Sequence, residues 1–403
     1  MFTTKEKAKI NEYYKIALER IKTKHIACFE GHEKPVFLIS DCYPGVWLEH
    51  VYDSVFFAKL DGKYIDIAKN TLMLFLNNQN ENGQFPCYVI DRKKCTDLPE
   101  YGYSQTQECV SFASLCYEYY EMSEDREFLK LAYDKCIKWV NWYKKYRMPS
   151  KKGLVEMFCG YDTGHDNSGR LEDVMYDRCA KDENAEEYPA GDNVLPAITP
   201  DMNAVFYGNL SALSKMAEAL GDLDAVRKWN EDAQFVKKQM FDICYDSDDE
   251  FFYDVDKNGN MRKYLSISVT NIFTEHMLDL DEMDIIYEKH LKNPNEFYMP
   301  YPFPSMAKSD KTFKKTLSGN SWGYYSQALT MLRCTRWMDF YGKSSDFDEI
   351  LEKWIKKWTF DNKIMFGQEL DPITGENSDC SQWYSSGMLI YIYAVKRLGL
   401  LEN

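Results

Sequence analysis

The stretch DMNAVFYGNLSALSKMAEALGDLDAVRKWNEDAQFVKKQM, residues 201–240, decides the fold class. Its apolar side chains recur about every 3.6 residues, which places them on one face of a helix in each half of the stretch. The two sets are Met202, Phe206, Leu210, Leu213, Ala217 and Leu220, then Val226, Trp229, Ala233, Val236 and Met240. Between them, Gly221 can end the first helix in the left-handed conformation and Asp222 can cap the second. The stretch therefore predicts two antiparallel helices joined by a tight turn.

The same pattern extends along the chain in roughly twelve segments. Residues 10–21 and 128–143 carry further helical stripes, and residues 120–125 and 341–346 have the composition of tight helix–helix turns. Strand signal is sparse, and Phe251-Phe-Tyr-Asp is the clearest candidate. Repeated helix pairs, with tight turns at one end and long loops at the other, predict an all-α toroid.

Domain organisation follows from what is missing between these segments. At 403 residues, a guide of about 150 residues per domain would suggest two or three domains. No low-complexity linker divides the chain, so we expect one domain over residues 1–403. Residues 147–200 and 360–380 are long loops, and loops beyond about 12–15 residues in a domain are usually functional or disordered. Their aromatic content and short motifs favour function.

Charge and composition exclude several classes of partner. The 49 Lys and Arg against 64 Asp and Glu give a net charge of −15, which repels nucleic acid and anionic membranes. No apolar run approaches the roughly 18 residues that span a bilayer, and the N-terminus lacks the apolar stretch of a secretory signal. We therefore expect a cytoplasmic protein. Monomer and homo-oligomer both remain open.

Cysteine and histidine content argues against metals. The 12 cysteines include no CxxC pair and the 6 histidines no HxxxH, so we expect reduced thiols, no zinc site and no disulfide framework. Aromatic residues make up 15% of the chain. They suit a pocket in which sugar rings stack on aromatic planes, although they also fill cores.

Two loop carboxylates are candidates for acid–base chemistry. Asp166 lies in GYDTGHDNSGR, residues 160–170, and Glu369 lies in GQELDPITG, residues 367–375. A carboxyl held against apolar walls keeps its proton and can act as an acid, while a better solvated one can act as a base. From residue type alone, solvated side chains or turn formers are the commoner reading of such residues, and Asp166-Asn-Ser also suits an Asx turn.

Eight motifs, in the family's order along the chain, resemble those of the inverting α-glycosidases related to mannosylglycerate hydrolase, glycoside hydrolase family 63 and the trehalases. Residues 164–170 resemble G-x-D-N-S-P-R with Gly169 in place of proline, and residues 369–375 resemble E-x-Y-D-P-x-T-G. The others are Trp47 with YDSVF (52–56) for W-D-S-x-F, QNENGQFP (79–86), Gln107 for Q-P-P without its prolines, PDMN (200–203), GNSWG (319–323) for G-P-V-W, and QWYSS (382–386). Their order over some 340 residues makes coincidence improbable.

The resemblance implies an (α/α)6 barrel without metal or organic cofactor. It implies that Asp166 is the general acid, protonating the glycosidic oxygen, and that Glu369 is the general base, activating a water on the opposite face of the sugar. In inverting enzymes these carboxyls lie about 6.5–9.5 Å apart. The candidate sugar-binding residues are Trp47, Tyr52, Asp53, Gln107, Arg170, Trp322 and Trp383.

Six of these binding residues also have a structural alternative. Trp322 and Trp383 could pack in helix N-terminal turns, and Tyr52, Asp53 and Gln107 could be buried residues bonded only to backbone. Arg170 could hold a sugar hydroxyl or pair with a carboxylate, and we favour the ion pair slightly. His165 is more typical of a structural histidine.

The function favoured is an inverting, exo-acting α-glycoside hydrolase, most simply an α-glucosidase acting on a small α-linked disaccharide or glycoside. The first alternative is a mannosylglycerate or glucosylglycerate hydrolase. A sugar epimerase or isomerase on an α/α barrel would use histidine pairs, which the few histidines disfavour. A non-catalytic sugar-binding protein would not need both carboxylates.

Overall fold

A computed structural model describes residues 2–40, 43–179, 185–314, 320–361 and 366–401. About 51% of the described residues are helical, and they include twelve α-helices. Gly319, the first residue of the GNSWG motif, lies outside the described residues.

The even-numbered helices form a closed cycle of contacts. Each contacts the next along the chain, from α2 to α4, α6, α8, α10 and α12, and α12 contacts α2 again. The last of these contacts joins the beginning of the chain to its end. The six inner helices are α2 (Val51–Leu60), α4 (Phe112–Ser123), α6 (Pro200–Leu220), α8 (Thr270–Thr274), α10 (Ala328–Trp337) and α12 (Ser385–Arg397).

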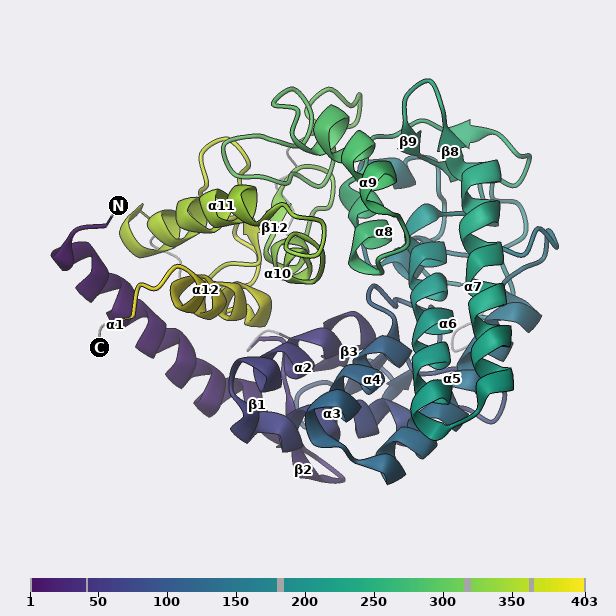
Figure 1. Ribbon diagram of the computed structural model, residues 1–403, viewed down its shortest axis with the longest axis horizontal. Helices are drawn as coiled ribbons and strands as arrows, with labels where there is room; N and C mark the ends of the chain where they lie inside the picture. Colours follow the sequence, from purple (N-terminus) through teal and green to yellow (C-terminus); the bar gives the residue numbers. More distant parts are fainter. Residues whose placement is uncertain (1, 41–42, 180–184, 315–319, 362–365, 402–403) are drawn as a thin grey trace.

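Five of the odd-numbered helices pack against this cycle. α1 contacts α12, α3 lies against α2 and α4, α5 against α4 and α6, α7 against α6, and α11 against α12. Figure 1 shows the circuit, from purple α1 through α6 and α7 to yellow α12, which returns beside α1. The odd-numbered helices are α1 (Thr4–Arg20), α3 (Ile65–Asn77), α5 (Arg126–Tyr146), α7 (Leu223–Cys244), α9 (Leu280–Ile286) and α11 (Ser344–Lys356).

The predicted helix pair of residues 201–240 is confirmed as α6 and α7. Pro200 opens α6, where its missing N–H costs nothing. Gly221 ends α6 at φ +88°, and its N–H donates to the carbonyls of Ala217 and Glu218. One residue later, the Asp222 side chain accepts from Ala225 N at 3.0 Å and caps α7. The turn is tight because a left-handed residue and a capping residue are adjacent.

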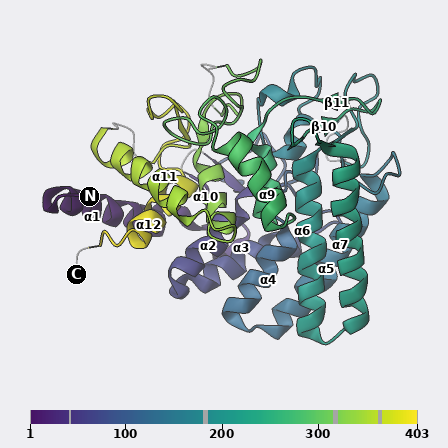
Figure 2. The same ribbon diagram turned by 45° about the horizontal axis from the view of Figure 1, so that its top comes forward.

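The other predicted tight turns also join consecutive helices. Glu124 adopts φ +56° after α4, and Asp125 caps α5 by accepting from Phe128 N at 3.0 Å. The long predicted loop from residue 147 is confirmed, since α5 ends at Tyr146 and α6 begins at Pro200. In Figure 2, β10 and β11 lie beyond the upper ends of α6 and α7, away from the short turn that joins these helices below. Long loops therefore lead into the inner helices and short turns leave them.

Short strands occupy these loops. The predicted strand at residues 251–254 is present as β9 and the start of β10, but most of the others have two or three residues and give no alternating pattern. They form small antiparallel sheets, of which β11-β10-β7-β6 and β3-β4-β5 are the largest. The strands are β1 (Ile26–Phe29), β2 (His32–Phe37), β3 (Gly45–Trp47), β4 (Tyr88–Ile90), β5 (Tyr101–Gly102), β6 (Glu156–Met157), β7 (Ala197–Ile198), β8 (Tyr245–Asp246), β9 (Phe251–Phe252), β10 (Asp254–Val255), β11 (Met261–Arg262), β12 (Ser326–Gln327) and β13 (Glu369–Leu370).

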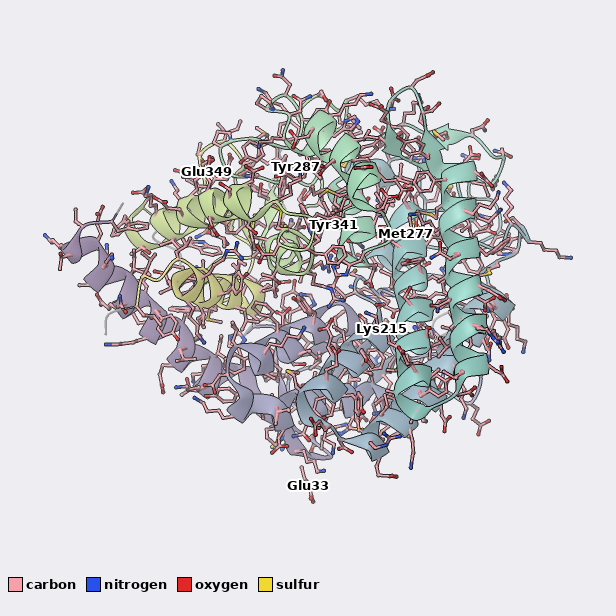
Figure 3. All side chains as sticks on the ribbon, in the orientation of Figure 1. Glu33, Lys215, Met277, Tyr287, Tyr341 and Glu349 are labelled. Carbon is pink, nitrogen blue, oxygen red and sulfur yellow. The ribbon has the colours of Figure 1, made fainter. Side chains whose placement is uncertain are left out.

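Large side chains fill the space between the helices. Tyr287 and Tyr341, labelled in Figure 3, are buried, and the hydroxyl of Tyr341 donates to the carbonyl of Leu278 at 2.9 Å. Much of the aromatic content is therefore core packing. None of the helices in the described part is both long enough and apolar enough to cross a membrane.

Candidate active site

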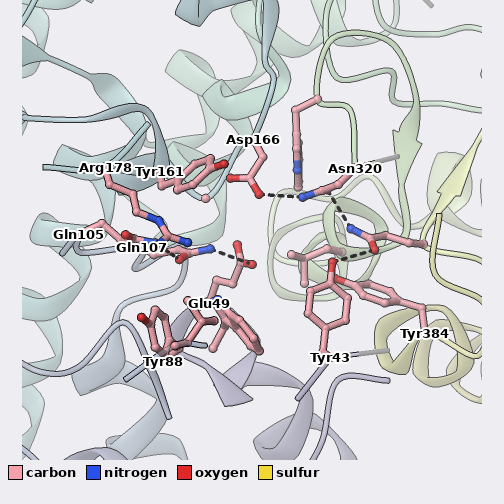
Figure 4. A pocket seen from close by; sticks show the side chains of 16 residues that line it. Tyr43, Glu49, Tyr88, Gln105, Gln107, Tyr161, Asp166, Arg178, Asn320 and Tyr384 are labelled. Atoms are coloured by element: carbon pink, nitrogen blue, oxygen red, sulfur yellow. Dashed lines mark hydrogen bonds between the residues drawn. The ribbon is translucent and has the colours of Figure 1, made fainter. Parts of the chain in front are cut away.

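A cavity of about 190 Å³ lies where the long loops enter the inner helices (Figure 4). Residues from the loops before α2, α4, α6, α10 and α12 line it, so five separate parts of the chain converge there. Its described lining residues are Tyr43, Trp47, Glu49, Tyr88, Leu98, Gln105, Gln107, Tyr161, Gly164, Asp166, Arg178, Asn320, Trp322, Leu329, Gln368 and Tyr384.

Aromatic side chains form much of the wall. Trp47 ends strand β3 and contacts Tyr43 and Tyr88, with ring centroids 5.4 and 5.6 Å apart. Across the cavity, Trp322 stacks on His165 at 4.1 Å, so one face of the indole is already covered. Aromatic planes with polar tips are typical of sites that bind sugar rings.

Asp166 lies in the cavity wall, two residues after Gly164. Gly164 adopts φ +67° at the end of a 3₁₀ turn, and this reversal directs the following residues toward the cavity. The Oδ2 atom of Asp166 accepts from the side-chain amide of Asn320 at 2.7 Å, and its carbonyl accepts from Trp322 N at 3.0 Å. Burial, with Asp177 adding to it, raises the pKa of Asp166 to about 6, against the opposing effects of Arg178 and Asn320.

Glu369 lies in β13, paired with Gln327 of β12, and is fully buried. Its Oε1 accepts from Ser321 N at 2.7 Å and from the Gln327 amide at 2.9 Å, and its Oε2 accepts from the Ser378 hydroxyl at 2.6 Å. Burial raises the pKa of Glu369, and these hydrogen bonds oppose the rise. Its neighbour Gln368 lines the cavity while Glu369 lies behind the lining.

One short segment connects the two carboxyls. Asn320 donates to Asp166, and the next residue, Ser321, donates its backbone N–H to Glu369. Asn320 adopts φ +53°, a conformation that asparagine tolerates better than most residues. The positions of Asp166 and Glu369 are therefore coupled through two consecutive residues.

A third carboxyl, Glu49, enters the cavity from the 3₁₀ turn Leu48–His50, just before α2. Its side chain is 11% exposed. Burial and the nearby charge of Asp166 raise the pKa of Glu49 to about 8, against the opposing charge of Arg333. At neutral pH this carboxyl holds its proton.

Of the predicted sugar-binding residues, Trp47, Gln107 and Trp322 line the cavity. Tyr52 and Asp53 do not line it, because they lie about one helical turn after Glu49, inside α2. The Tyr52 hydroxyl is 2.8 Å from Thr335 Oγ1, and Asp53 accepts from the hydroxyls of Ser385 and Ser386 at the start of α12. These contacts bind α2 to α10 and α12.

Arg170 and Trp383 also lie away from the cavity lining. Arg170 is buried and forms ion pairs with Asp201 and, at 3.0 Å, with Asp254. Of its two predicted roles, the structure shows the ion pair. Trp383 adopts φ +57° and packs against the guanidinium of Arg20, 4.8 Å from the ring centroid.

Sequence reasoning missed several lining residues, chiefly Tyr43, Glu49, Tyr161, Arg178 and Asn320. Asn320 could have been identified from the sequence, because it lies inside the GNSWG motif. Arg178 lies between α5 and α6, in an irregular segment without a recognisable sequence pattern. Within the described residues it has no hydrogen bond or ion pair, and it is the one Lys or Arg in the cavity lining.

Cys159, Asp162 and Cys179 form a group of metal-capable side chains outside the cavity, with ligand atoms within 4.8 Å of one another. Asp162 is not available as a ligand there. Both its oxygens accept hydrogen bonds from Arg147, with which it forms a fully buried ion pair, and from backbone N–H groups. The eleven described cysteines are free thiols.

Comparison with known proteins identifies the family. The model of the mannosylglycerate hydrolase MGH1-like glycoside hydrolase domain matches residues 52–386. The GH63 mannosylglycerate hydrolase from Thermus thermophilus, solved in complex with glucose, is similar over 94% of this chain and 99% of its own, at 14% identity and a TM-score of 0.74. The same hydrolase has been solved with Tris and D-glycerate.

Two further proteins are similar to this chain, one with a lower TM-score and one over a shorter stretch of sequence. Neutral trehalase Nth1 from Saccharomyces cerevisiae is 14% identical, with a TM-score of 0.66 over 90% of this chain and 73% of its own. An uncharacterized protein from Borreliella burgdorferi is 28% identical over 134 residues, which is 33% of this chain and 27% of that protein.

The resemblance drawn from the motifs is thereby confirmed, and at these identities the structural likenesses show the shared fold. The chain belongs to the mannosylglycerate hydrolase MGH1-like family of glycoside hydrolases, a group of O-glycosyl hydrolases.

Proposed function

We propose that this protein is an inverting, exo-acting hydrolase of a small α-glycoside, with Asp166 as general acid and Glu369 as general base. The observation that carries the proposal is the link between the two carboxyls through Asn320 and Ser321 at one cavity. A single displacement needs two carboxyls at a fixed separation of about 6.5–9.5 Å. A segment that is hydrogen-bonded to both carboxyls can keep their separation fixed.

Asp166 has the properties of an acid. Its pKa near 6 keeps an appreciable fraction protonated around neutral pH, and its Oδ1 has no hydrogen-bond partner among the described residues. The proton can therefore be delivered to the oxygen that leaves the sugar.

The choice of base lies between Glu369 and Glu49. Glu49 holds its proton at neutral pH, and a protonated carboxyl cannot accept another from water. The hydrogen bonds from Ser321, Gln327 and Ser378 favour the ionised form of Glu369. Glu369 is not itself a lining residue, but its neighbour Gln368 is. The family motif around Glu369 supports its assignment as the base.

The cycle of inner helices supports an (α/α)6 barrel, and the matched range supports a single catalytic domain over residues 1–403. The described free thiols suit a reducing, cytoplasmic location. Neither assignment depends on the identity of the sugar.

Cavity size supports a small substrate. Sites for drug-sized ligands have volumes of about 300–1,000 Å³, and this one has about 190 Å³. That space suits one sugar ring, so a terminal sugar is removed. We propose a terminal α-glucoside in a small disaccharide or glycoside.

A second candidate is a glycoside whose leaving group is glycerate. Arg178 favours it, because an exposed, unpaired guanidinium at the cavity can bind a carboxylate with two hydrogen bonds. The D-glycerate found with the Thermus hydrolase is consistent with this candidate.

One assay tests both candidates. Purified protein is offered α-linked glucose disaccharides, glucosylglycerate and mannosylglycerate, and the released sugar is followed by NMR. Hydrolysis with the β-anomer appearing first is expected. Initial release of the α-anomer would indicate a covalent intermediate, and no hydrolysis of any α-glycoside would contradict the proposal.

A further inference from the structure

Glu49 is a cavity carboxyl that the proposed reaction does not use, and it is poorly hydrogen-bonded. Its donors are distant, with the Gln107 amide at 3.3 Å from Oε1 and the Cys109 thiol at 3.8 Å from Oε2. His50 Nδ1 is 3.3 Å from Oε1 but makes no hydrogen bond, and burial lowers the pKa of His50 well below its usual value. No short hydrogen bond reaches Glu49 within the described residues.

The buried glutamates Glu108 and Glu369 have short hydrogen bonds, unlike Glu49. Glu108 accepts hydrogen bonds from Phe112 N, Asn209, Trp139 and Tyr143 at 2.7–3.1 Å. Glu369 has three donors at 2.6–2.9 Å. Polar groups that are mostly shielded from solvent are rarely left with weak hydrogen bonds in native structures unless a ligand or water supplies better ones. Glu49 differs from these residues because it faces the cavity.

The fold holds Glu49 in this position. A Cβ on Gly164 would lie 2.5 Å from Oε2 of Glu49 and 2.5 Å from the Cys109 sulfur, so the loop that leads to Asp166 packs directly on this carboxyl. Figure 4 shows Glu49 pointing into the cavity below Asp166, beside Gln107. The close contact removes the space into which Glu49 could turn away.

The same segment also supplies an aromatic surface. Trp47 lies two residues before Glu49, and both line the cavity. When the face of a sugar ring lies on an aromatic side chain, its hydroxyl groups point outward from the ring edge. An acceptor beside the aromatic residue is therefore placed to meet them.

We propose that Glu49 binds hydroxyl groups of the sugar ring and so selects which sugar the cavity accepts. This inference rests on the proposed function, because it assumes that the cavity holds the sugar. It assigns Glu49 a binding role that is separate from proton transfer by Asp166 and Glu369.

The test compares the binding of monosaccharides by calorimetry. D-Glucose, D-mannose and the 2-, 3-, 4- and 6-deoxyglucoses are titrated into the wild-type protein, Glu49→Gln and Glu49→Ala. For the wild type, loss of the hydroxyl that contacts Glu49 should weaken binding about 10- to 100-fold. In Glu49→Ala the same deoxy sugar should bind as well as its parent, and Glu49→Gln should give an intermediate result.

Glu118→Gln is the matched control. Glu118 is a partly buried α4 carboxylate that pairs with Lys59 and Arg336 away from the cavity lining, so its loss should lower the melting temperature and leave sugar discrimination unchanged. Equal discrimination by the wild type and both Glu49 variants would overturn the inference while leaving hydrolysis intact. A wild type that neither binds these sugars nor hydrolyses an α-glycoside would overturn the proposed function itself.

Discussion

The side-chain amide of Asn320 donates a 2.7 Å hydrogen bond to Oδ2 of Asp166, joining residues 154 positions apart. The bond favours the ionised form of the carboxyl, whereas burial favours the protonated form. The proton affinity of Asp166 is thus the balance of two opposed effects, and one side chain can be removed to alter it.

Asn320→Gly should extend activity to higher pH. A general acid works only while protonated, so wild-type kcat/KM should fall as pH rises through about 6. Without the amide the pKa of Asp166 rises, and the fall should move upward by about 0.5–1 pH unit. Glycine tolerates the φ of +53° at this position. Lys151→Gly, a change at φ +59° away from the cavity lining, should not move the profile. A profile unchanged in Asn320→Gly would mean that Asp166 does not control the alkaline limb.

Asp166→Asn should lower the rate on a natural α-glycoside by about 10²–10⁴. Asparagine has nearly the same shape but carries no proton to deliver. A glycosyl fluoride, whose leaving group needs less protonation, should lose less. Steady-state rates on the two substrates measure the difference, and equal losses on both would remove Asp166 from the role of acid.

Glu369→Gln should impair both substrates by a similar factor, again about 10²–10⁴, because the nucleophilic water is no longer activated. Glutamine retains an acceptor for Ser321 N, so the fold should persist, which circular dichroism and the melting temperature verify. A near-normal rate in a folded variant would argue that another group is the base.

Arg178→Gln should separate the two substrate candidates. If the leaving group is glycerate, KM for the charged substrate should rise about 10- to 100-fold while a neutral disaccharide is little affected. If KM is unchanged for both, Arg178 does not bind the leaving group. The variant should also raise the pKa of Asp166, because the guanidinium now lowers it.

Arg170→Met should destabilise the protein by about 3–5 kcal/mol, because Asp201 and Asp254 would remain buried without their cation. Protonation removes that penalty, and burial already raises the pKa of Asp254 to about 6. The loss measured by urea unfolding should therefore be smaller at pH 5 than at pH 8. A loss that does not depend on pH would point to packing instead of charge.

Helices and their turns were predictable because their signals are local. The stripe ending at Leu220, the glycine at 221 and the cap at Asp222 are read within one window, and the structure follows them. The two- and three-residue strands were not predictable, since they depend on pairing with distant segments such as β7 with β10.

The site was predictable only where motifs carried it. Asp166, Trp47, Gln107 and Trp322 reach the cavity. Asp53 carries a carboxyl like Glu49, but it lies about one turn later, inside α2. There it accepts hydrogen bonds from the hydroxyls of Ser385 and Ser386. A sequence shows that a segment is rich in polar groups; which of them faces the cavity depends on contacts with helices hundreds of residues away.

Closure of the helical cycle delays completion of the site during synthesis. Asn11 donates to the carbonyl of Leu400 at 2.8 Å across 389 positions, and the cavity needs both Trp47 and Tyr384. At about 5–20 residues per second, a ribosome takes roughly 20–80 seconds to reach α12. Throughout that interval the faces of α1 and α2 that α12 covers have no native partner. The nascent chain is then inactive and exposes apolar helix faces, which makes it prone to aggregation until α12 has been made.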